Sequence, residues 1–116
     1  MYVHNQMVRN WMIKWFKRPQ LNEMKVKHEV ISKHLLNMIP GCKVRRKRDF
    51  NENAMIFYVE ISGMIKEFKI SDQYLQDYTT TELFDFIKQK EVIQNISNHR
   101  RVKISTREGY PSVSYM

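Results

Sequence analysis

The chain has little cysteine, glycine or proline, and each shortage excludes a class of protein. The single cysteine, Cys42, cannot form an intramolecular disulfide, so a disulfide-stabilised secreted scaffold is excluded and a reducing compartment is the simplest fit. Three glycines and three prolines exclude collagen-like chains and flexible linkers. No apolar run approaches the roughly 18 residues of a membrane-spanning helix. Arg9, Lys14 and Lys17 interrupt any signal-peptide core. We therefore expect a cytoplasmic protein without a membrane partner.

What the chain does contain is enough apolar residues for one folded domain. Leu, Ile, Val and Phe make up about 27% of its 116 residues, above the roughly 20% below which chains remain disordered. The only alanine is Ala54, whereas isoleucine, lysine and asparagine are abundant. This composition accompanies AT-rich genomes and, in so short a chain, favours a bacteriophage or mobile element. Such a protein would act in the host cytoplasm.

Positive charge is in excess and is distributed unevenly. The formal net charge is +8 and the sequence pI is about 9.7. Residues 1–48 carry a net +10, residues 49–98 a net −5 and residues 99–116 a net +3. A chain of this kind can present a basic face to a polyanion. The alternative is a solvated surface of uneven composition.

The hydrophobic periodicity changes twice along the chain. Apolar residues at helical spacing predict helices over residues 3–17 and 22–39, which end at Pro19 and at Pro40-Gly41. A period of two then predicts strands over 42–49, 54–61 and 64–70. Thr79 and Glu82 have the capping-box spacing and precede a helical region that extends to about residue 97. Two short strands follow, joined by a turn at Glu108-Gly109, and Pro111 places the last strand at a sheet edge.

These elements predict an α+β fold in the order α-α-β-β-β-α-β-β, with a three-stranded antiparallel meander and a C-terminal β-hairpin. One face of the meander is almost purely apolar, so the helices must cover it. We divide the chain into an aromatic and basic N-terminal helix, residues 1–20, and a single α+β domain, residues 21–116. The first segment is either an appendage or an interface.

The segment from Lys43 to Arg48 is the strongest functional signal, because five of its six residues are cationic. If Cys42 and Val44 face the core, Lys43, Arg45 and Lys47 face outward and share a surface with Tyr58. Cations neutralise phosphates and an exposed ring can stack on a base. The predicted nucleic-acid-binding residues are Lys43, Arg45, Arg46, Lys47, Arg48, Tyr58, Lys69, Arg100, Arg101, Lys103 and Arg107.

A second interpretation of the same segment is structural. Charged side chains on an edge strand prevent edge-to-edge aggregation. In the predicted register, Glu60 and Glu67 also lie on the outward face, and Arg46 and Arg48 point inward, which is compatible only with the rim of the sheet.

The first helix carries Trp11, Trp15 and Phe16 beside basic residues. These aromatics can pack on the sheet, form a homodimer or partner-protein interface, or, as the weakest alternative, lie on a membrane surface.

Signals for catalysis are poor. Asp49 with Glu67 and Lys69, and Glu29 as a further carboxylate, loosely fit the Asp…Glu-x-Lys spacing of metal-dependent nucleases. The histidines are not spaced as metal ligands, and no glycine-rich phosphate loop is present. We therefore expect a non-enzymatic protein with no cofactor or metal.

The sequence thus predicts a small nucleic-acid-binding protein, with DNA the favoured ligand, that acts as a phage or mobile-element regulator. The alternative is a protein-interaction module, such as a phage inhibitor or adaptor of a host protein. A metal-dependent nuclease is a minor alternative.

Overall fold

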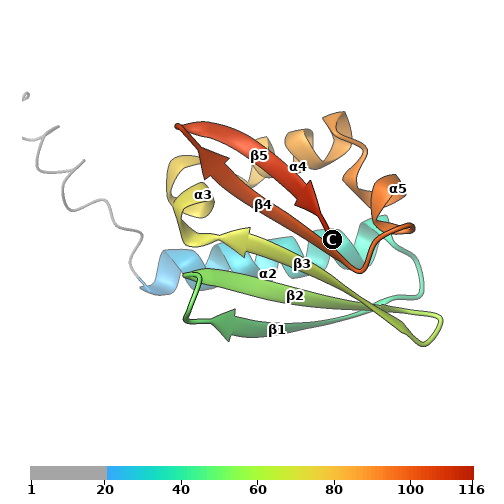
Figure 1. Ribbon diagram of the computed structural model, residues 1–116. Helices are drawn as coiled ribbons and strands as arrows, with labels where there is room; N and C mark the ends of the chain where they lie inside the picture. Colours follow the sequence, from blue (N-terminus) through green and yellow to red (C-terminus); the bar gives the residue numbers. More distant parts are fainter. Residues whose placement is uncertain (1–20) are drawn as a thin grey trace, which may run out of the picture.

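The computed structural model describes residues 21–116 (Figure 1). The predicted first helix, with Trp11, Trp15 and Phe16, lies outside the described residues, and so does the division of the chain after residue 20. The elements are α2 (Leu21–Met38), β1 (Lys43–Asp49), β2 (Ala54–Ile61), β3 (Met64–Ser71), α3 (Asp72–Asp77), α4 (Thr80–Gln89), α5 (Val92–Ile96), β4 (Arg101–Arg107) and β5 (Tyr110–Tyr115).

The five strands form one sheet in the order β1-β2-β3-β4-β5. All neighbours are antiparallel except β3 and β4, which are parallel. A parallel pair requires a crossover connection, and the three helices between β3 and β4 supply it. The basic strand β1 and the proline-containing strand β5 are therefore the two edges of the sheet.

One face of the sheet is covered by helices, and the other, which we call the open face, carries no helix among residues 21–116. Alternate residues of the central strands, among them Phe57, Phe68 and Val102, are fully buried against the helical layer. The helix α2 contributes Ile31 and Leu35 to the same core at helical spacing. In Figure 1 the helices lie behind the sheet, so the view is onto the open face. No helix within residues 21–116 is long and apolar enough to cross a membrane.

The predicted α+β class and the meander are confirmed. Both hairpin turns formed by a polar residue and a glycine have two positive φ angles: 51° and 80° at Ser62-Gly63, and 54° and 82° at Glu108-Gly109. Two consecutive positive φ angles match the type I′ turn, whose twist suits a two-residue hairpin. The residue order of the sequence alone was therefore sufficient to locate these turns.

The helical region predicted from the Thr79 capping box to about residue 97 is divided into α4 and α5, and the short turn expected before it, over residues 71–78, contains the helix α3. The chain is extended at Tyr78, which ends α3, and Glu91 adopts a left-handed φ of 51° between α4 and α5. The capping box is present as predicted: Thr79 accepts from the Glu82 amide, and the Glu82 carboxylate accepts from the Thr79 amide. These breaks let three short helices follow the sheet surface.

A buried histidine makes the stability of this fold depend on pH. His28 of α2 is only 7% exposed and packs edge-on against Phe57, and its Nε2 has no hydrogen-bond partner among the described residues. Burial lowers the pKa of His28 below 6.5, and the positive charges of Arg46 and Arg48 lower it further, against the opposite effect of Asp72. The folded state therefore favours the neutral ring.

We expect the melting temperature to fall as the pH drops from 7 to 5. Below about pH 6.5 the unfolded chain binds a proton at His28 that the folded chain resists, so folding stability declines. His28→Leu should flatten this decline, as measured by thermal melts at half-unit pH steps. An identical pH dependence in the variant and the wild type would show that His28 is not responsible.

Candidate functional site

The pairing register aligns charged residues in rows across the open face. Arg45 pairs with Tyr58, which pairs with Glu67, which in turn pairs with Arg101. The adjacent row consists of Lys47, Ile56, Lys69 and Lys103. The predicted outward set of Lys43, Arg45, Lys47, Arg101 and Lys103 is therefore brought together on one face, and Tyr58 lies among them.

The cations of β1 on this face form what we call the basic edge, defined as Lys43, Arg45 and Lys47. All three side chains are exposed, and none of them makes an ion pair with a residue of the described chain. Alternate residues of a strand are about 6.6 Å apart, so the basic edge presents three positive charges in a line at regular spacing.

Three other cations of the open face, Lys69, Lys103 and Arg101, are paired with carboxylates, whereas Arg107 at the end of β4 is exposed and makes no ion pair within the described chain. Lys69 pairs with Asp49 at 2.9 Å and also with Glu52, and Lys103 pairs with Glu52 at 3.2 Å. The hydrogen bond from Lys69 is the main reason why the pKa values of Asp49 and Glu52 lie below their usual range, and Lys103 lowers that of Glu52 further. These pairs leave β3 and the first part of β4 with less unopposed charge than β1.

The row through Tyr58 is neutralised in the same way at its far end. The Nε of Arg101 donates to Glu67 across the parallel pair at 2.6 Å. Both side chains are on the open face, so the second predicted basic strand, β4, presents less free charge than its sequence suggests.

The remaining predicted binding residues are not part of the row of the basic edge, although Arg46 and Arg48 belong to the same strand and line the hollows beside it. Arg46 and Arg48 point toward the helical side of β1, at the rim of the sheet as the sequence required. Arg48 is held by both carboxylate oxygens of Asp72, one at 2.6 Å, and this hydrogen bond raises its pKa. Arg100 precedes β4, and Arg107 ends it; both are exposed.

Tyr58 lies between two shallow hollows. One, of about 410 Å³, is lined by Tyr58, Ile56 and Lys47 together with Phe50 of the β1–β2 turn. The other, of about 400 Å³, is lined by Tyr58, Arg45, Lys47 and Ile65, among others. Sequence reasoning missed Phe50, which is 81% exposed. An aromatic residue directly before the polar Asn51–Asn53 turn was the available signal.

The two strand carboxylates of the nuclease-like pattern, Asp49 and Glu67, are not brought together, although Lys69 of the pattern pairs with Asp49. Glu67 lies beside Tyr58 in the sheet, whereas Asp49 lies beside Ala54, four residues further along β2. Four residues of strand span about 13 Å, too far for one metal ion to bridge. Both carboxylates are also paired with cations. Among residues 21–116, no group of three or more histidine, cysteine, aspartate or glutamate side chains could hold a metal ion.

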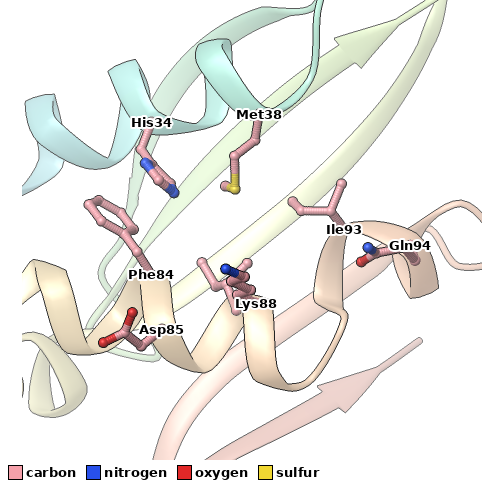
Figure 2. A pocket seen from close by; sticks show the side chains of 8 residues that line it. His34, Met38, Phe84, Asp85, Lys88, Ile93 and Gln94 are labelled. Atoms are coloured by element: carbon pink, nitrogen blue, oxygen red, sulfur yellow. The ribbon is translucent and has the colours of Figure 1, made fainter.

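A separate groove opens on the helical side, between α2 and the α4–α5 pair (Figure 2). Its volume is about 440 Å³, and at one end the His34 ring stacks on Phe84 with centroids 3.6 Å apart. Burial lowers the pKa of His34. The groove is lined by His34, Met38, Phe84, Asp85, Ile87, Lys88, Ile93 and Gln94. Local spacing did not reveal this groove because its walls are about 50 residues apart in the chain.

Comparison with known proteins adds no relative: no family model, no curated protein and no solved structure matches this chain. The open face and the groove are therefore the two surfaces from which a function can be inferred.

Proposed function

We propose that this protein binds nucleic acid through the basic edge, without catalysing a reaction. The observation that supports the proposal is the line of three exposed cations, free of ion pairs within the described chain, beside the half-buried ring of Tyr58. Cations that are not already neutralised can release counterions from phosphates, which is the main source of affinity for nucleic acid.

The distribution of ion pairs supports this proposal over simple protection of an edge strand. Protection from edge-to-edge aggregation requires only charged side chains along β1, and cations that form ion pairs would provide it equally well. Here Lys69, Arg101 and Lys103 are all neutralised, while Lys43, Arg45 and Lys47 remain unopposed and regularly spaced. A spacing of about 6.6 Å is comparable to the distance between successive phosphates of a strand.

The experiment is a titration of labelled DNA and RNA oligonucleotides by fluorescence anisotropy over a salt series. We expect dissociation constants below about 10 μM at 50 mM salt, and an affinity that falls about 20-fold between 50 and 200 mM if three phosphates are contacted. Absence of binding to every oligonucleotide at 50 mM salt would refute the proposal. The roles of regulator and of phage protein remain predictions of the sequence.

The ion pairs of the open face should limit the affinity for nucleic acid. Glu52 accepts from Lys103 and from Lys69, so Glu52→Gln frees Lys103 for a phosphate while Asp49 still holds Lys69. We expect tighter binding and a salt dependence steeper by about 0.7 in the log–log slope, the contribution of one added phosphate contact. Glu91→Gln, an equal charge change at an exposed position between α4 and α5, serves as the control and should have a smaller effect.

The helical groove favours a second candidate function, capture of another protein. Its apolar lining by Met38, Phe84 and Ile93 and the charged Asp85 and Lys88 beside them are typical of an interaction site (Figure 2). In a pull-down from lysate, a partner bound there would persist after nuclease treatment and be lost in Lys88→Glu. A partner that disappears with nuclease would instead have been held by nucleic acid.

A further inference from the structure

We infer that the ligand of the basic edge is a single strand of nucleic acid, whose bases are unpaired and stack on Tyr58 and Phe50. This inference rests on the proposed function and names the class of ligand. It depends on three observations: the placement of the two rings, the hollows beside them, and the acidic residues on the inner side of the basic edge.

The two rings are available for stacking in different ways. Tyr58 is half-buried in the sheet, directly across from Arg45, with a hollow on either side of it. Phe50 is 81% exposed in the adjacent turn and lines one of the same hollows, and the Arg48 guanidinium lies 5.8 Å from the centre of its ring. Exposed rings on a sheet that also carries cations are the usual means of holding unpaired bases.

The separation of the rings indicates one base for each. Asp49, the neighbour of Phe50, pairs with Ala54, which lies four residues before Tyr58. The two aromatic positions are therefore about 13 Å apart along the strand. Two rings that enclose one base must be about 7 Å apart, since stacked atoms approach to about 3.5 Å. Tyr58 and Phe50 thus serve different bases, with Ile56 and Lys47 between them.

The charges around Tyr58 favour one phosphate backbone over two. On the β1 side of the ring are Arg45 and Lys47, and on the other side are Glu60 and the ion pair of Glu67 with Arg101. A single strand can run its phosphates along the basic edge and turn its bases inward over Tyr58. A duplex laid on the same face would bring its second backbone over these carboxylates, and its bases would have no free faces for the rings.

The test compares binding of three probes of equal length under identical salt conditions: oligo-dT, oligo-U and a mixed-sequence DNA duplex. We expect both single strands to bind at least about fivefold more tightly than the duplex. Tyr58→Leu should weaken single-strand binding about fivefold or more, given the contribution of one stacked base. Tyr58→Phe, which keeps the ring, should bind as the wild type does.

Two further variants complete the design. Phe50→Leu should also weaken single-strand binding. Because Phe50 is exposed, this variant should stay folded even if Tyr58→Leu destabilises the protein. Tyr110→Leu is the matched control: this ring is 74% exposed but lies at the start of the opposite edge strand, so its loss should change the affinity less than twofold.

The outcomes separate the two proposals. The single-strand inference would be overturned if the duplex bound as tightly as the single strands or more tightly. If replacing Lys43, Arg45 and Lys47 abolished that duplex binding while Tyr58→Leu and Phe50→Leu left it unchanged, the proposed function would still hold. Failure of all three probes to bind would remove both. The inference would also be overturned if Phe50→Leu and Tyr58→Leu weakened single-strand binding no more than the control Tyr110→Leu does.

Discussion

Replacing Lys43, Arg45 and Lys47 together with glutamine is expected to weaken binding to nucleic acid about 100-fold at 0.1 M salt. Three phosphate contacts on a single strand contribute a slope of about −2.1 to log K against log salt, so at 0.1 M their removal costs about two orders of magnitude. The three side chains are exposed and lie on an edge strand. The variant should therefore retain its melting temperature, and the effect should be confined to binding.

The control is a variant with the same change in net charge at a different place. Lys25, Lys33 and Lys90 are exposed on the helical side of the molecule, and their joint replacement with glutamine lowers the net charge by the same three units. We expect this variant to keep most of the affinity and the salt slope. Equal losses in both triple variants would mean that total charge, rather than the basic edge, governs binding.

Phe57→Ala is expected to destabilise the folded state by about 3–5 kcal/mol, the range for truncation of a buried phenylalanine. Phe57 lies at the centre of β2 with no exposed surface, between Arg46 and Phe68 in the pairing register and against His28 of α2. The cavity would open where α2 meets the sheet. Chemical denaturation followed by circular dichroism measures the change, provided that the transition remains two-state.

Phe50→Ala gives the matched comparison, because it removes the same side chain from the same region of the chain. At 81% exposure, Phe50 contributes little to the core, and its replacement should change the unfolding free energy by less than about 0.5 kcal/mol. If the two alanine variants were equally stable, the assignment of the covered and open faces of the sheet would be wrong.

Much of the fold could be predicted because its signals are local. The alternation in Lys43–Arg48 and in the second strand identified which side chains face outward, since a strand has a period of two. The register confirms that Lys43, Arg45, Lys47 and Tyr58 share one face. Turn residues and a capping box act within a few positions of the chain, and each was located correctly.

The helical region after β3 was predicted less well. Apolar residues at helical spacing continue across Glu91, and periodicity does not distinguish one helix over residues 79–97 from the two helices α4 and α5. The breaks arise from tertiary contacts as much as from local preference. For example, the Lys27 amine donates to the carbonyls of Leu75 and Tyr78, 48 and 51 residues away, and thereby satisfies the end of α3.

By itself, then, the sequence determined the α+β class, the turns, the faces of the strands and the position of the densest positive charge, because each depends on neighbours within a few residues. Only the tertiary structure decided which cations remain free. The pairs Lys69–Glu52, Arg101–Glu67 and Lys103–Glu52 join residues 17, 34 and 51 positions apart. The sheet order that brings them together is set by packing over the whole domain. Three exposed cations of the net charge of +8, Lys43, Arg45 and Lys47, thereby remain in a line on one strand without an ion pair among the described residues, and they form the basic edge.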